Sequence, residues 1–302
     1  METSQAVNPL EEDGQHPPRD LRSILKHLGP GIIISASIVG SGELIATTTL
    51  GAKVGLVALW LIVLSCLIKV VVQQELGRYT ISSGETGFQG LNRVPGPRWR
   101  VSWVVWAYML MFCGVTFQTG GILGGLGQVF NLALPQLSVE TWSLITAVTV
   151  GVLLFGQGYR KIEKISIFMV VIFTFITVVC AILLAWTPHR ISPKEIMEGF
   201  HFRLPAGGLG VAFAAFGITG VGATELVSYP YWCLEKGYAR FTGRKEGSSD
   251  WVQRSRGWIR VMQIDTILAM VVYTVATVAF YILGARILYG MGNIPAGYEM
   301  VK

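Results

Sequence analysis

The feature that most constrains this chain is a series of long apolar segments separated by short polar stretches. About 20 apolar residues suffice to cross a bilayer as a helix. Inside a membrane, every backbone polar group must find a partner within the protein, which favours helices. The segments therefore predict an all-α fold, a polytopic transmembrane helical bundle. Its expected spans are residues 29–50, 54–74, 101–127, 141–157, 165–186, 207–234 and 260–284.

The composition supports a membrane protein with a polar N-terminal tail. The chain is 52% hydrophobic and 14% charged, whereas soluble domains carry about 25% charged residues. Residues 1–27 are polar and contain no signal peptide, so we expect a tail followed by a transmembrane domain over residues 28–302. The four cysteines fall in or beside apolar segments, which indicates small buried residues rather than disulfides or a metal cluster.

The positive charges predict how the chain lies in the membrane. Most of the 24 Lys and Arg residues fall in residues 1–27, 75–100 and 158–164 and in a basic linker at 235–259. The positive-inside rule places these stretches in the cytoplasm. We therefore expect a multi-pass protein of the cell (plasma) membrane with a cytoplasmic N-terminus. The net charge of +6 is then a topology signal, and no nucleic-acid partner is expected.

One short motif occurs twice, each time inside a long apolar segment. Residues 39–45 read Val-Gly-Ser-Gly-Glu-Leu-Ile, and residues 221–227 read Val-Gly-Ala-Thr-Glu-Leu-Val. A carboxylate inside a span is expensive and marks a functional site by default. The small residues before it weaken the helix. Two copies at matching depth predict an internal repeat with two broken helices, near 40–42 and near 222–225. Small residues also serve close helix packing, but packing does not account for both glutamates.

The two motifs together predict a cation site. A broken helix frees backbone carbonyls at membrane depth, and carboxylates and hydroxyls add further oxygen ligands. The expected metal ligands are Glu43, Glu225, Gly40, Gly222, Ser41 and Thr224. Further residues expected to line the site are Gly42, Ala223, Leu226, Ser228 and Thr47. Oxygen-only coordination suits Mg²⁺, Ca²⁺ or Mn²⁺. Two carboxylates in one low-dielectric cavity repel each other, and one takes up a proton unless a cation binds.

Two other charged residues lie in the apolar segments and have structural interpretations. Lys69 either snorkels to the interface, which the sequence favours, or has a polar partner. Asp265 is expected to cap its own helix or to pair with the basic linker rather than bind an ion. The four histidines show no ligand spacing.

The motifs resemble those of one known family. Leu28-Gly29-Pro30-Gly31, followed by the first broken motif, is similar to the first helix of the NRAMP (natural resistance-associated macrophage protein) divalent-metal transporters. Gly222-Ala223-Thr224 resembles the sequence that leads into that family's Met-Pro-His motif in the sixth helix. The resemblance covers about residues 25–290. It implies the LeuT-like fold of two inverted five-helix repeats, with the transported metal between helices one and six and no other cofactor.

The chain also departs from that family's pattern. The family's Asp-Pro-Gly-Asn falls on residues 40–43, and its Val-Met-Pro-His falls on residues 225–228. The soft thioether of the sixth helix is therefore replaced by Leu226, and the acid is displaced to Glu43. The third helix has Thr116, Gln118 and Thr119 where the family tends to carry acids. Proton coupling and selectivity for Mn or Fe are therefore not expected to carry over.

The sequence favours a divalent metal ion transporter of hard-cation type, for Mg²⁺ or Mn²⁺, and not an enzyme. One alternative is a Na⁺-coupled symporter for a small solute on the same fold, and another is a non-transporting sensor or scaffold. A membrane hydrolase using Glu43 and Glu225 lacks any supporting motif. Five spans in the first repeat and two in the second suggest a protein truncated after the seventh span. The oligomeric state stays open.

Overall fold

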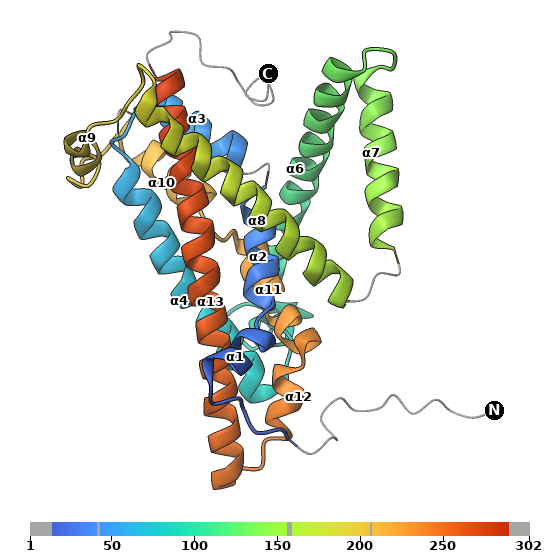
Figure 1. The fold of residues 1–302 in the computed structure, drawn as a ribbon. Helices are drawn as coiled ribbons and strands as arrows, with labels where there is room; N and C mark the ends of the chain where they lie inside the picture. Colours follow the sequence, from blue (N-terminus) through green and yellow to red (C-terminus); the bar gives the residue numbers. More distant parts are fainter. Residues whose placement is uncertain (1–13, 41–42, 156–158, 206, 290–302) are drawn as a thin grey trace.

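The computed structural model describes residues 14–40, 43–155, 159–205 and 207–289, and these residues are almost entirely helical (Figure 1). The expectation of an all-α fold is confirmed, because the two strands have only two residues each. The elements in order are α1 (Leu21–His27), α2 (Pro30–Ile38), η1 (Glu43–Thr47), α3 (Thr48–Val54), α4 (Leu59–Ser83), α5 (Gly87–Leu91), β1 (Arg98–Trp99), β2 (Val101–Ser102), α6 (Trp103–Ala133), α7 (Val139–Leu154), α8 (Tyr159–Leu183), η2 (Leu184–Trp186), α9 (Pro193–Glu198), α10 (Gly208–Ile218), α11 (Ala223–Lys236), α12 (Tyr238–Thr242), α13 (Ser249–Leu283) and η3 (Gly284–Leu288).

The predicted spans all appear as helices, although two of them are short. By length and composition, α4, α6, α8 and α13 are each long and apolar enough to cross a membrane. The pair formed by α2 and η1–α3 passes the same test as one span bent by 48°. Helix α7, at 16 residues, and α10, at 11 residues, are shorter apolar helices. They correspond to the fourth predicted span and to the first half of the sixth.

The basic segment 235–259 is not the linker that the sequence predicted. It contains the end of α11, all of α12 and the beginning of α13. Helix α13 starts at Ser249 because the side chain of Ser248 accepts a hydrogen bond from the backbone N–H of Trp251 at 3.1 Å. Hydropathy located only the apolar part of this helix, since its first residues are mostly polar.

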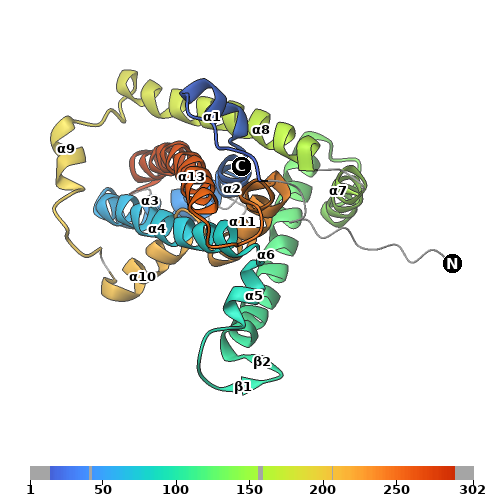
Figure 2. The ribbon, with the colours of Figure 1, turned by 90° about the horizontal axis from the view of Figure 1, so that it is seen from below.

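Helix α13 lies at the centre of the bundle. It packs against α2, α3, α4 and α8, and Figure 2 shows it between α4 and α8. One apolar cluster surrounds Trp258, Tyr229 and Tyr238, and a second surrounds Ile62 and Tyr281. The first motif-bearing segment packs on α13, the second packs on α4, and α4 and α13 pack on each other, so the fold brings residues far apart in sequence to one place.

The span that carries the first motif is fixed to the end of α13 by direct backbone contact. A Cβ at Gly284 would lie 2.1 Å from the carbonyl oxygen of Thr48, and one at Gly51 would lie 2.4 Å from that of Tyr281. The Tyr281 hydroxyl donates to the Gly55 carbonyl and accepts from the Ala58 N–H at 3.0 Å. These contacts fix the chain after α3 and so fix the position of η1.

Helix α9 is held against the same end of α13 by an ion pair. The Arg286 guanidinium lies 2.9 Å from Oε1 of Glu195 and also donates to the carbonyls of His189 and Arg190. A hydrogen bond from the Ser192 N–H and the charge of Arg286 hold the pKa of the Glu195 carboxyl below its usual value. Figure 1 shows α9 at the end of the bundle opposite α12 and the beginning of α13.

Helices α6 and α7 form a hairpin at the side of the bundle (Figure 1). Their outward side chains are mostly large and apolar, and Phe117 is 83% exposed. Such a surface is what a helix presents to lipid. Only one face of α6 therefore takes part in the interior.

Candidate functional site

The first motif breaks its span as predicted. Helix α2 ends at Ile38, and Gly40 lies in a turn before the π-helix η1 begins at Glu43. Ser41 and Gly42 lie outside the described residues. The Gly40 carbonyl accepts the Leu44 N–H at 3.2 Å. One of its two lone pairs is therefore used within the backbone.

The second motif also breaks its span, but three residues earlier than expected. Helix α10 ends at Ile218, residues 219–222 are not helical, and α11 begins at Ala223. The break falls there because Gly220 adopts φ +71°, and because the Gly222 carbonyl already accepts the Leu226 N–H at 3.0 Å. Glu225 consequently lies in the first helical turn of α11 rather than in the break.

Glu43 connects the two breaks. Its side chain is 2% exposed, and Oε1 accepts the backbone N–H of Gly220 at 2.9 Å. Oε2 accepts the hydroxyl of Thr47, which lies one helical turn further along and is fully buried. The hydrogen bond between Glu43 and Gly220 confirms that the broken regions of the first and sixth spans face each other.

Glu225 is held differently from Glu43. Its half-buried side chain accepts the Thr224 hydroxyl at 2.8 Å through Oε2. A Cβ added at Gly222 would lie 2.4 Å from the same oxygen. The carboxylate therefore folds back over the N-terminus of its own helix, where the helix dipole favours a negative charge.

Lys69 occupies the other side of the second break. Its ammonium donates to the carbonyls of Thr219 at 2.6 Å and of Gly217 at 3.2 Å, and the side chain is 8% exposed. The interpretation of Lys69 as a snorkelling residue is therefore wrong. The end of a half-helix leaves carbonyls without intrahelical partners, and those carbonyls attract the ammonium more strongly than the interface does.

A cavity of about 610 Å³ opens between the two breaks. Of the predicted site residues, it is lined by Glu43, Gly222, Ala223, Thr224 and Glu225. Gly40 is not among the lining residues, and Ser41 and Gly42 lie outside the described residues. Thr47 bonds Glu43, Ser228 donates to the Thr224 carbonyl at 2.8 Å, and Leu226 packs against the apolar core.

Other elements complete the cavity wall. Ser37 of α2 and Met111, Gln118 and Thr119 of α6 line it. The sequence pointed to Gln118 and Thr119 only through the family pattern, and it missed Ser37 and Met111. Val115, another lining residue, comes four positions after Met111, and that spacing marks one helix face. The thioether absent from the sixth helix is thus present in the wall that α6 provides.

The described residues contain no group of three His, Cys, Asp or Glu side chains close enough to hold a metal ion. Any cation in the cavity would therefore need carbonyl, hydroxyl, amide or water oxygens besides the two carboxylates. Hard divalent cations commonly accept such mixed oxygen sets.

Asp265 positions the first half of the broken first span. It is fully buried, and its carboxylate accepts the N–H groups of Gly29 at 3.0 Å and Gly31 at 2.6 Å. It therefore caps α2 rather than its own helix, while Lys236 of the basic segment acts on it electrostatically. No sequence signal marked this pairing, because more than 230 residues separate the partners.

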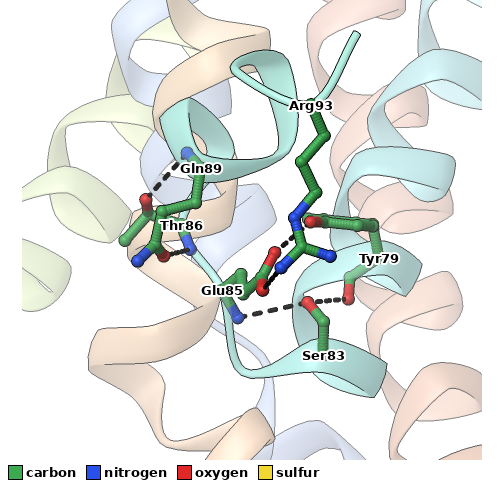
Figure 3. A network of polar contacts seen from close by, with 6 residues as sticks. All are labelled: Tyr79, Ser83, Glu85, Thr86, Gln89 and Arg93. Atoms are coloured by element: carbon green, nitrogen blue, oxygen red, sulfur yellow. Dashed lines mark hydrogen bonds and ion pairs between the residues drawn. The ribbon is translucent and has the colours of Figure 1, made fainter.

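A polar network at the corner between α4 and α5 supports the elements that form the cavity wall (Figure 3). Glu85 accepts from the Tyr79 hydroxyl and from Arg93, and Thr86 and Gln89 form a capping box at the start of α5. Helix α5 in turn contacts α11, since a Cβ at Gly87 would lie 2.9 Å from the Val227 carbonyl. The ring centres of Phe88 and Tyr108 lie 4.9 Å apart, and this contact ties α6 to the same corner.

Comparisons with known proteins agree with this architecture. A family model described as Natural resistance-associated macrophage protein-like matches residues 31–298. A divalent metal cation transporter MntH from Staphylococcus haemolyticus is 25% identical over 94% of this chain and 61% of its own length. Another from Deinococcus radiodurans is 26% identical over 93% of this chain and 60% of its own length. The chain thus spans about three fifths of the length of these relatives.

Solved structures show the same fold. A manganese transporter from Eremococcus coleocola superposes with a TM-score of 0.64 at 16% identity, covering 93% of this chain and 56% of that one. A mutant of the same transporter gives the same score over 92% of this chain and 55% of that one. The LeuT-like arrangement with a broken first and sixth helix is therefore confirmed for the described residues.

Proposed function

The chain belongs to the natural resistance-associated macrophage protein-like family, and from this premise we propose that it carries a divalent metal cation across the cell membrane. The cation would bind in the cavity between the two broken spans. The proposal includes the multi-pass placement, with the N-terminus in the cytoplasm. The relatives from Staphylococcus haemolyticus and Deinococcus radiodurans are named as divalent metal cation transporters.

The observation that carries the proposal is that Glu43 and Glu225 line one cavity at the facing breaks of two apolar helices. Two carboxylates sharing a low-dielectric space favour a bound cation, which relieves their repulsion. The N-terminus of α11 would otherwise suit an anionic solute, but Glu225 already lies over it. A carboxylate-bearing substrate is therefore disfavoured.

We infer a preference for Mg²⁺ or Mn²⁺ from the donor atoms. The cavity wall offers carboxylate, hydroxyl and amide oxygens from Glu43, Glu225, Thr119 and Gln118, and Met111 is the one thioether among its described lining residues. Oxygen ligands suit hard cations, and a thioether adds affinity for softer ones. Met111→Leu should therefore lower the ratio of Mn²⁺ to Mg²⁺ transport while Mg²⁺ transport persists.

The test is uptake of Mg²⁺ and Mn²⁺ by the protein in proteoliposomes. Glu43→Gln and Glu225→Gln should each reduce uptake at least about tenfold, because Gln keeps an acceptor oxygen but loses the charge that offsets cation dehydration. Glu75→Gln is the matched control, since Glu75 lies on α4 outside the cavity, is 60% exposed and pairs with Arg78. Unchanged uptake in both cavity variants would refute the proposed site.

The orientation has a separate test. Glu246→Cys precedes α13, and Lys194→Cys lies in α9, at the opposite ends of the bundle in Figure 1. In a background without the native cysteines, an impermeant thiol reagent added outside intact cells should label the variant at 194 and not the one at 246. Labelling of both from outside would exclude the proposed topology.

A further inference from the structure

Lys69 is a charged side chain in the middle of a helix long enough to cross the membrane, and the proposed function gives it no role. It lies in α4 between Leu59 and Ser83, and its side chain is 8% exposed. A cation at such a depth is costly unless protein groups replace its water. The groups that do so are backbone oxygens of the broken sixth span.

The groups around the Lys69 ammonium are of the kind that bind a cation. It contacts the carbonyl oxygens of Thr219 and Gly217 at 2.6 and 3.2 Å and lies 5.5 Å from the ring centre of Phe216. Ser65, one turn earlier on the same helix face, donates to the carbonyls of Phe216 at 2.9 Å and Thr219 at 3.1 Å. One face of α4 therefore covers the open end of α10.

The charges around this position favour a cation. The C-terminal end of α10 carries the negative end of the helix dipole. Glu43 of η1 and Glu225 of α11 both act electrostatically on Lys69. Helix α13 contributes Tyr273, whose ring lies near Gly220. In broken membrane helices, the carbonyls at a half-helix C-terminus coordinate Na⁺.

We propose that Lys69 is a tethered cation that occupies an alkali-cation position at the end of the broken half-helix α10. The ammonium satisfies the carbonyls of Gly217 and Thr219, so the protein needs no free Na⁺ or K⁺ there. Removing the ammonium leaves these carbonyls and the Ser65 hydroxyl as an oxygen site for Na⁺. The proposal concerns the same break as the proposed function but does not depend on which cargo the cavity takes.

The test is the effect of Na⁺ on the stability of the purified chain in detergent, with choline at equal ionic strength as the reference. The melting temperature of the wild type should be the same in both salts. Lys69→Ala should melt lower in choline and rise by about 5 °C in NaCl, the shift expected when the ion is present at about 100 times its Kd. Binding of radioactive Na⁺ should appear in this variant and be absent in the wild type.

Two matched variants separate a cation position from an ordinary structural contact. Lys69→Arg keeps the charge and should show no response to Na⁺. Ser65→Ala removes a donor to the carbonyls of Phe216 and Thr219 without removing the charge, and it too should not respond. A Lys69→Ala protein that melts lower but ignores Na⁺ would show that Lys69 only caps the helix, and would overturn the proposal.

The remaining outcomes are also decisive. If Lys69→Ala is recovered folded in NaCl but not in choline, Na⁺ replaces the ammonium and the proposal stands. If it is recovered in neither salt, the ion does not substitute and the proposal fails. Saturable Na⁺ binding at this position in the wild type would overturn it as well. None of these readouts uses divalent-cation uptake, so the proposed function can fail while this inference holds, and the reverse.

Discussion

In both broken spans, a charged side chain from a neighbouring unbroken helix holds one end of the first half-helix. The two spans differ in which end is held. In the first span, Asp265 of α13 accepts the N–H groups at the N-terminus of α2. In the sixth span, Lys69 of α4 donates to the carbonyls at the C-terminus of α10. Each sign matches the helix dipole. The two breaks therefore have similar sequence motifs but are held by side chains of opposite charge.

The two glutamates differ as well, although they occupy the same place in the repeated motif. Glu43 follows its break and reaches across to the Gly220 N–H, whereas Glu225 folds back over Gly222 of its own segment. Glu43 is buried and has two partners, and Glu225 is half-buried with Thr224 as its partner. We therefore expect Glu43 to matter for both folding and binding, and Glu225 mainly for binding.

The largest effect should come from the support of the first span. Asp265→Ala leaves two buried N–H groups without an acceptor, and each such loss costs about 1 to 3 kcal/mol. We expect a loss of about 3 kcal/mol, measured as a lower melting temperature in detergent. Asp250→Ala on the same helix is the control, because Asp250 is 53% exposed and its ion pair with Arg254 contributes less than about 1 kcal/mol. Equal melting of the two variants would show that α2 does not depend on this cap.

The next effect should separate the two glutamates. Glu43→Ala removes the buried acceptor of the Gly220 N–H and the Thr47 hydroxyl, and it should cost about 2 kcal/mol. Glu225→Ala removes a half-buried side chain with one hydroxyl partner and should cost less than about 1 kcal/mol. Thermal melting of both variants measures the difference. A lower melting temperature for Glu225→Ala than for Glu43→Ala would contradict the expected difference between the two glutamates.

Hydropathy and the repeated motif predicted the helices, the two breaks and the cavity between them. They succeeded because the cost of placing a carboxylate and glycines in an apolar span is a local property of the sequence. They failed on Lys69 and Asp265 because the partners of both are backbone groups of distant segments. A backbone carbonyl or N–H has no sequence identity, so no pattern marks it as a partner.

Two other errors also have physical causes. The position of the second break depended on Gly220, whose left-handed conformation puts the turn before the glutamate. The motif could not distinguish Gly220 from Gly222, since both are glycines. Met111 was missed because α6 is apolar on most sides, so that periodicity does not single out the face towards the cavity.

The third largest effect on stability should come from replacing a glycine in the second break, and the matching replacement in the first break is its comparison. Gly220→Ala forces a side chain into φ +71° and places its Cβ 3.1 Å from the Cys66 sulfur, so we expect a loss of about 1.5 kcal/mol. Gly40→Ala should be nearly neutral, since the nearest atoms are carbonyl oxygens of the preceding helix at 3.9 Å. Melting curves in detergent give both values. A neutral Gly220→Ala would mean that the second break tolerates a different backbone path.

The smallest effect on stability should be the most informative about the cavity. Gly222 has φ −74° and ψ 167°, which any residue adopts, so Gly222→Ala should change stability by less than about 0.5 kcal/mol. Its methyl group would lie 2.4 Å from Oε2 of Glu225 and must move that carboxylate off the helix N-terminus. We expect apparent affinity for the proposed divalent cation to weaken about threefold, the scale of a helix-end charge interaction of about 0.7 kcal/mol. Gly217→Ala is the control, because it also lines the cavity but its added methyl meets no atom within 4 Å. If the two variants bind the cation equally well, the placement of Glu225 over its own helix does not contribute to the site, and the two glutamates differ in packing alone.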